Sequence, residues 1–98
     1  MNFIQKKDRA IVFLLPDDLK KNISEDALSQ VQNEAIHDVE VRYSGGEDLT
    51  LTGLSELVYI AARIRAHGKR VELTAPASVV DNMKICSMDS SFDGVRVG

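Results

Sequence analysis

One stretch near the middle of the chain restricts the possible folds most strongly, because it joins strand, helix and strand with almost no spacer. The extended residues 49–51 lead through Thr52 and Gly53 into an amphipathic pattern over residues 54–67. A glycine ends this pattern, as is typical of helix C-termini, and residues 69–76 follow as a strand. Such a succession favours a sheet with parallel strands and helices packed on it.

Further segments extend the same alternation along the chain. The expected strands are an edge strand at residues 3–5, a strand buried on both faces at 10–15, an alternating strand at 39–43 and a short last strand at 92–97. Residues 17–23 are polar and are expected to be irregular, and Ser24 is the expected N-cap of a first helix that ends near residues 37–38. Residues 44–48 are expected to form a turn, and a third helix is expected from Ala77 to about Cys86. The chain therefore predicts one α/β domain, residues 1–98, with a mixed sheet of four to five strands and three to four helices packed on it.

The composition excludes several classes of function. With 44% apolar and 28% charged residues in 98 positions, the chain has the make-up of one ordered globular domain. Its formal charge of −3 and its scattered Lys and Arg residues argue against nucleic-acid binding, which needs a basic stripe. Apolar runs are too short to span a membrane and the N-terminus lacks the apolar core of a secretion signal. We therefore expect a cytoplasmic protein without direct membrane insertion.

Side chains suited to a metal or a cofactor are few. His37 and His67 are expected at helix ends, and neither has carboxylates around it at the spacing of a known ligand set. The single cysteine, Cys86, is expected to be a small buried residue. Because no glycine-rich phosphate loop is present either, we predict no metal, no cofactor and no catalytic residue. Asp17 and Asp18 leave one alternative open, a small enzyme or ligand binder in which these carboxylates bind a cation or act as acid and base.

The hydroxyl of Thr52 lies at the expected start of the second helix. A threonine before a glycine at such a place is most often an N-cap, whose side chain accepts from an unpaired backbone N–H group. The same place suits a phosphate, because free N–H groups and the positive end of the helix dipole face it. The residues alone leave both roles open for Thr52.

Residues 39–92 resemble the STAS domain, the family of anti-sigma-factor antagonists. That family shows a strand, a segment of the type Asp-Ser-Ser/Thr-Gly-Leu, an amphipathic helix ending in Gly, a strand, a Pro and a third helix. Residues 49–54, Leu-Thr-Leu-Thr-Gly-Leu, correspond to the segment, and residues 61–76 look like the family's following helix and strand. Residues 12–18 resemble the family's first core strand and its acidic loop. The resemblance implies a single STAS-like domain.

A regulatory protein rather than an enzyme is what the resemblance implies. In the family a partner serine/threonine kinase phosphorylates the hydroxyl residue immediately before the glycine, which is Thr52 here. The resemblance also implies that a protein partner, an anti-sigma factor or its kinase, binds at the start of the second helix. The implied partner-binding residues are Asp17, Asp18, Thr50, Leu51, Thr52, Gly53, Leu54, Ser55, Glu56 and Tyr59.

The chain also departs from the family pattern. Thr50 stands where the family commonly has aspartate, Leu51 where it often has serine, and Arg42 where an acidic residue often ends the preceding strand. These departures favour an alternative, a constitutive and non-phosphorylated subunit of a chemotaxis signalling complex or of a lipid-transport ABC system. The sequence leaves the identity of the partner, the pathway and the oligomeric state open.

Overall fold

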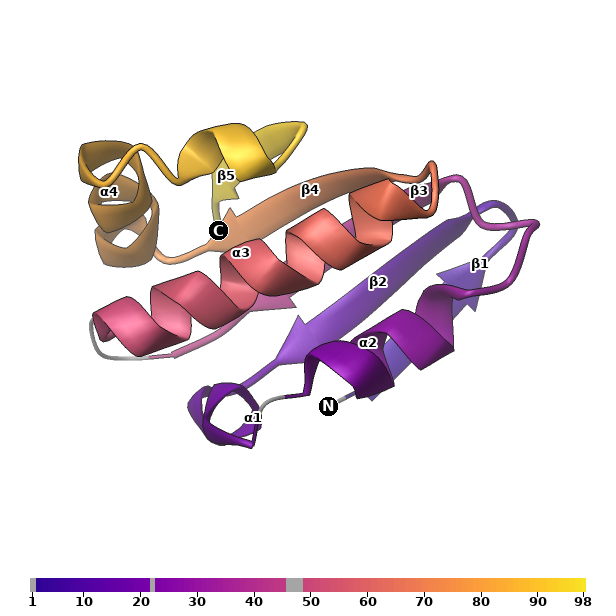
Figure 1. Ribbon diagram of the computed structural model, residues 1–98, viewed down its shortest axis with the longest axis horizontal. Coiled ribbons are helices and arrows are strands. Elements are labelled where there is room, and N and C mark those ends of the chain that lie inside the picture. Colours follow the sequence, from indigo (N-terminus) through magenta and orange to yellow (C-terminus); the bar gives the residue numbers. More distant parts are fainter. Residues whose placement is uncertain (1, 22, 46–48) are drawn as a thin grey trace.

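A five-stranded mixed sheet forms the body of the protein in the computed structural model, which describes residues 2–21, 23–45 and 49–98 (Figure 1). The strands are Asn2–Lys6 (β1), Arg9–Leu14 (β2), Asp38–Tyr43 (β3), Arg70–Ala75 (β4) and Gly94–Val97 (β5). The helices are Pro16–Lys20 (α1), Ser24–Val31 (α2), Leu51–Ala66 (α3) and Ala77–Ile85 (α4), with a 3₁₀ turn at Asp89–Ser91 (η1). The α/β class and the mixed sheet predicted from the sequence are confirmed.

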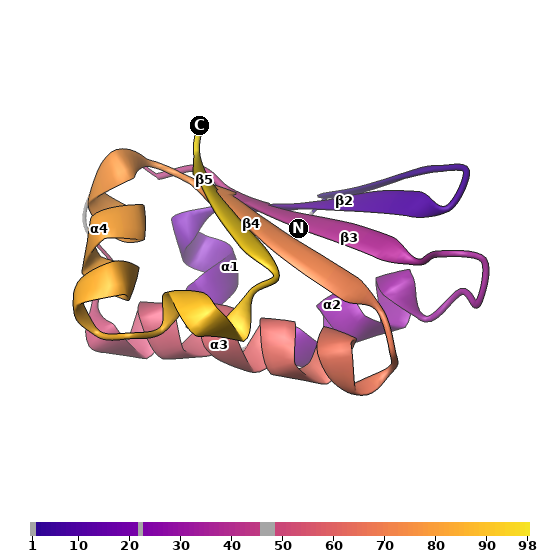
Figure 2. The ribbon, with the colours of Figure 1, turned by 90° about the horizontal axis from the view of Figure 1, so that it is seen from above.

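The strands follow one another across the sheet in chain order, from β1 to β5. β1 pairs with β2 in antiparallel fashion, and the three other neighbouring pairs are parallel. Because each crossover adds its strand on the same side of the previous one, crossovers of one hand place every helix on the same face of the sheet. Figure 2 shows this arrangement edge-on, with the helices of the described residues all on one side.

The core lies between the sheet and the helices. Every second residue of the three central strands is buried there: Ala10, Val12, Leu14, Val39, Val41, Tyr43, Val71, Leu73 and Ala75. The helix α3 buries Leu54, Leu57, Ile60, Ala61 and Ile64 against them. This is the apolar face expected from the helical spacing. Gly68 follows the C-cap residue of α3, His67, with a φ of +77°, a left-handed conformation that glycine adopts without strain.

Two expectations about burial are wrong. β2 is not buried on both faces: Ile11 and Phe13 are only half-buried, because nothing in the described part of the chain covers the outer face of the sheet. Cys86 is exposed rather than buried. It lies just beyond the end of α4, whose inward residues are Val79, Val80 and Met83.

Several boundaries also differ from the prediction. The segment after Leu15 is not irregular but begins with α1, because Pro16 presets a helical φ at the first position. Ser24 is the first residue of α2 and not its N-cap, and the helix ends at Val31 rather than near residues 37–38. Of the turn expected at residues 44–48, residues 46–48 lie outside the described part of the chain.

A buried carboxylate stabilises the uncovered face of the sheet. Glu40 of β3 is only 4% exposed, although it points away from the helices. Its Oε1 accepts from Nη2 of Arg9 at 2.6 Å, and its Oε2 lies 2.7 Å from Nη2 and 2.8 Å from Nε of Arg42. Burial by itself raises the pKa of Glu40, but the hydrogen bonds from Arg42 and Arg9 outweigh it, so the pKa lies below its ordinary value of 4.5.

We expect this carboxylate to make the stability of the protein depend on pH. Since the pKa of Glu40 is lower in the folded state, its stabilisation is complete above about pH 4.5 and is lost as the pH falls through the lower folded value. Glu40→Gln should therefore lower the free energy of unfolding by about 1–3 kcal/mol at neutral pH, and less in acid. Urea unfolding between neutral pH and pH about 3 measures the difference. Glu34→Gln, a change at an exposed residue, is the control, and a difference that does not shrink in acid contradicts the assignment.

Candidate functional site

The first turn of α3 lies at the edge of the sheet where the parallel strands end. β2 leads into α1, β3 leads toward α3 and β4 leads into α4, so the starts of these helices gather at this edge. Figure 1 shows α1 and the beginning of α3 at the same end of the molecule, and α1 packs against α3. The acidic loop and the helix start singled out in the sequence are therefore brought together.

The N-cap of α3 is Thr50. The sequence left two roles open for Thr52, and the N-cap role is wrong. Oγ1 of Thr50 accepts from the backbone N–H of Gly53 at 3.2 Å, and the helix begins at Leu51. This differs from the extended conformation expected for residues 49–51. Thr52 is the second residue of the helix and is exposed, so its hydroxyl is not engaged in capping.

Two of the expected partner-binding residues support the helix start from inside. Gly53 is buried, and a Cβ on it would lie 3.2 Å from Cδ2 of Leu49. The glycine therefore permits the close approach of Leu49 to the first turn. Leu54 is 4% exposed and belongs to the core. Leu49 and Leu54 occupy the positions before the cap and in the first turn where an apolar pair commonly fixes the entry of the chain.

Exposed side chains surround these two buried residues. Leu51 is 65% exposed, and Thr50, Thr52 and Ser55 are exposed as well. Leu15, between β2 and α1 at the same edge, is 59% exposed and was missed from the sequence. The proline after it could have revealed it, because Pro16 at the first helical position leaves Leu15 as the residue before the helix rather than as the end of a buried strand.

Asp17 and Asp18 take different roles within α1. Asp18 is the third residue of the helix, and its Oδ2 accepts from the backbone N–H of Leu15 at 2.7 Å, as the acid of a capping box does. Burial acts to raise the pKa of Asp18, but this hydrogen bond and nearby positive charge, that of Lys21 included, lower it overall. Asp17 is exposed and lies 4.0 Å from Nζ of Lys20. Asp18 therefore has a structural function in capping α1. This function argues against the alternative in which Asp17 and Asp18 act together as acid and base.

Glu56 and Tyr59 point toward α2 rather than toward the edge. Oε1 of Glu56 accepts from the backbone N–H of Ser24 at 3.2 Å, so it serves the N-terminus of α2, where no side-chain cap is formed. The hydroxyl of Tyr59 accepts from Arg63 at 2.9 Å, and Arg63 also pairs with Glu25 of α2 at 2.6 Å. Tyr59 is still 46% exposed. These contacts join α2 to α3 at some distance along the helix from Thr52.

The electrostatics of the α3 start differ from those of the preceding helices. The first turn of α1 carries Asp17 and Asp18 and that of α2 carries two acids, whereas the first turn of α3 carries none. Within the described residues, the backbone N–H groups of Leu51 and Thr52 have no hydrogen-bond acceptor. The positive end of the α3 dipole is therefore not neutralised by a side chain of its own first turn.

The histidines lie at the other edge of the sheet, away from the α3 start. His37 follows the end of α2 at some distance and directly precedes β3, so it is not at a helix end. His67 is the C-cap of α3. A hollow of ≈ 390 Å³ at this edge of the sheet is lined by His37, His67 and Lys69, among other residues. Across the described ranges, no three His, Cys, Asp or Glu side chains come together in a way that could hold a metal ion.

Comparison of the chain with family models, with curated proteins and with solved structures found no match in any of the three. Among the helices of the described residues, none combines the length and the apolar character that crossing a bilayer requires.

The cap can be tested separately from the exposed threonine beside it. Thr50→Ala should lower the free energy of unfolding by about 1 kcal/mol, because it leaves the N–H of Gly53 without an acceptor. Thr50→Asp should keep the stability, since an aspartate caps as well. Thr52→Ala should change it much less. Urea unfolding of the three variants measures these changes. A larger loss of stability for Thr52→Ala than for Thr50→Ala would contradict the assignment of Thr50 as the cap.

Proposed function

We propose that this chain is a non-enzymatic, STAS-like regulatory protein that binds a partner protein through the first turn of α3. The observation that carries the proposal is the exposure of Leu51 and Thr52 directly beside a capped and well-packed helix start. A rigid helix end that presents an apolar side chain costs little ordering entropy on binding. Leu15 at the same edge extends the apolar area. The partner is an anti-sigma factor or its serine/threonine kinase, and the cytoplasm is the location that belongs to this proposal.

Phosphorylation of Thr52 is the switch in this proposal. A phosphate adds nearly two negative charges at the second residue of α3. The domain tolerates them, because the first turn of α3 carries no acid and the helix dipole favours a negative charge there by roughly 0.3–1 kcal/mol. A partner that covers Leu51 would instead have to remove water from the phosphate. An unfavourable charge in an interface costs several kcal/mol, which is enough to release the partner.

A second candidate function is a constitutive subunit of a chemotaxis complex or of a lipid-transport ABC system. It is favoured by Thr50 and Leu51, which replace the aspartate and the serine common in the family. The same exposed apolar side chains would then dock permanently. The mass of the intact protein isolated from its native cells separates the two functions, because a constitutive subunit carries no phosphate in any growth phase.

The switch predicts different effects of two substitutions at one residue. Thr52→Glu should weaken the binding of the partner at least about tenfold, because it introduces a charge that the interface must desolvate. Thr52→Ala should bind like the unchanged protein and should abolish the added phosphate mass. The partners to assay are an anti-sigma kinase, a transporter ATPase and a chemotaxis protein, chosen by which of them a neighbouring gene is found to encode, and calorimetry measures the affinity.

Ser29→Glu, a new charge on the exposed side of α2, is the matched control and should leave binding unchanged. Leu51→Ser and Leu15→Ser test the docking surface itself and should weaken binding whether or not a switch exists. Unchanged binding of folded Thr52→Glu contradicts the switch. Unchanged binding of both leucine variants contradicts the whole proposal.

A further inference from the structure

The outer face of the sheet, the face that no described helix covers, carries a different charge from the rest of the chain. Its cations, placed there by strand alternation and register, are Lys6, Arg9, Arg42, Arg70 and Arg96. Its anions among the described strand residues are Asp38, Glu40 and Glu72. These residues give the face an excess of positive charge, although the whole chain carries −3.

Two glutamates at the centre of this face organise the arginines. Glu40 and Glu72 are register partners on the neighbouring strands β3 and β4, a placement in which like charges repel. Each is compensated by two arginines. Glu40 pairs with Arg9 and Arg42, whereas Glu72 pairs with Arg96 and, at 3.3 Å, with Arg70.

The arginines around Glu72 are both fixed and accessible. The side chains of Arg70 and Arg96 are 57% and 60% exposed. The hydrogen bond from Arg96, opposed by burial and assisted by Arg70, lowers the pKa of Glu72, so the cluster keeps its charges at neutral pH. Since a guanidinium has five N–H donors, each arginine has donors left for a further acceptor. Such planar, oriented donors favour carboxylate groups, which they bind through two parallel hydrogen bonds.

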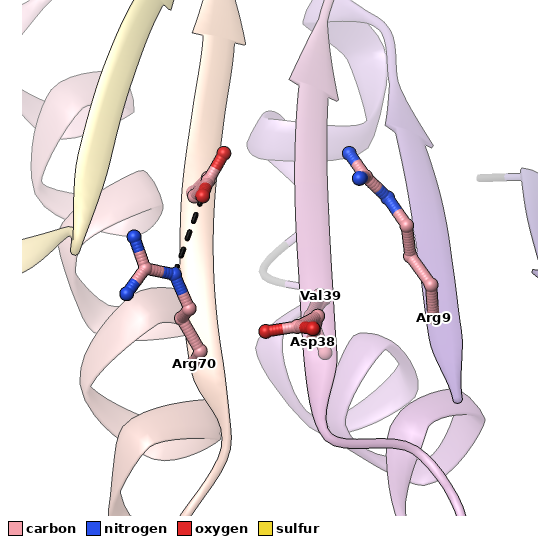
Figure 3. A pocket seen from close by; sticks show the side chains of 5 residues that line it. Arg9, Asp38, Val39 and Arg70 are labelled. Atoms are coloured by element: carbon pink, nitrogen blue, oxygen red, sulfur yellow. Dashed lines mark hydrogen bonds and ion pairs between the residues drawn. The ribbon is translucent and has the colours of Figure 1, made fainter.

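A hollow of ≈ 120 Å³ lies on the same face, lined by Arg9, Asp38, Val39, Arg70 and Glu72. Figure 3 shows Arg9 and Arg70 on the two strands that flank Asp38, as their register requires. The lining contains as many acids as arginines, so it offers acceptors as well as donors. That mixture suits a polypeptide, whose backbone N–H groups and carboxylates need both, better than a uniformly negative polymer such as nucleic acid.

Apolar side chains continue the face toward β1. Ile4 is 53% exposed, and it is the register partner of the half-buried Ile11. Phe13 lies next along β2, with the guanidinium carbon of Arg42 5.5 Å from the centre of its ring. The outer face is thus divided. Exposed apolar side chains lie over β1 and β2, whereas over β3 to β5 the arginines Arg42, Arg70 and Arg96 are matched by Asp38, Glu40 and Glu72. The excess of positive charge on the face comes from Lys6 and Arg9.

We infer that the outer face of the sheet binds an acidic amphipathic segment of a partner protein, with apolar residues on Ile4, Ile11 and Phe13 and carboxylates on the exposed Arg9, Arg70 and Arg96. The five cations and three anions of the whole face, together with its exposed apolar side chains, identify this occupant. The site lies on the side of the sheet away from the helices, so it is separate from the docking surface at the α3 start and does not depend on it.

A fluorescein-labelled peptide of repeated Leu-Glu-Glu triplets is the probe, used with the full chain at an ionic strength of about 0.15 M and measured by fluorescence anisotropy. Arg70→Gln combined with Arg96→Gln should weaken binding about fivefold, because two contacts to carboxylates are lost. Glu72→Gln should strengthen binding, since it removes a negative charge and frees the same arginines. Ile4→Ser should weaken binding through the apolar part.

Matched controls change the same charge or apolarity elsewhere. Lys20→Gln combined with Lys84→Gln removes two positive charges from exposed helix positions, and Ile85→Ser alters the 79% exposed isoleucine of α4. Both should bind like the unchanged protein. The inference is overturned if the peptide does not bind, if a Leu-Lys-Lys peptide binds as well, or if the lysine control loses as much as the arginine variant. It is also overturned if duplex DNA competes better than the peptide. Glu72→Gln decides the matter if the arginine variant fails to fold.

Discussion

The direction in which strands are added to the sheet determines most of what this protein presents to its surroundings. Each of β2 to β5 is placed beside its predecessor on the same side, so the crossovers put every described helix on one face. That face becomes the core. The starts of α1, α3 and α4 meet at the edge where the parallel strands end, and the opposite face of the sheet stays open. The two surfaces proposed here are both consequences of this topology.

An open sheet face has to be stable in water and still specify its register. Here the central strands solve this with charge rather than with polar uncharged residues. Glu40 and Glu72 lie opposite each other, and the arginines of four strands surround them. A shift of register by one residue would place these charges in the core and the core valines in water. The ion pairs around the buried Glu40 therefore oppose misregister, at a desolvation cost that the paired arginines offset.

The sequence predicted those parts of the structure in which local pattern and tertiary contacts agree. The strand alternation, the apolar stripe of α3 and the glycine at 68 were sufficient to give the order of the strands and of the longer helices, but not the short helix α1. Prediction from the sequence failed where residues distant along the chain determine the local structure. Ser24 is not a cap because Glu56 of another helix serves that helix end. The burial of β2 was overestimated because a continuous apolar run does not reveal whether one face or two will be covered.

The candidate site shows the same division between local and distant causes. The sequence predicts that a helix starts near Thr52. It does not predict that Thr50 is the cap, because this depends on the exact residue at which the helix begins. The cap at Thr50 also changes the meaning of the departure from the family pattern. Aspartate and threonine both cap a helix, so Thr50 keeps the cap and removes only the charge. A neutral cap repels a phosphate at Thr52 less than an aspartate would, and it leaves Leu51 next to an uncharged residue. The departure therefore makes the helix start more apolar without weakening it, which suits a docking surface in both of the proposed functions.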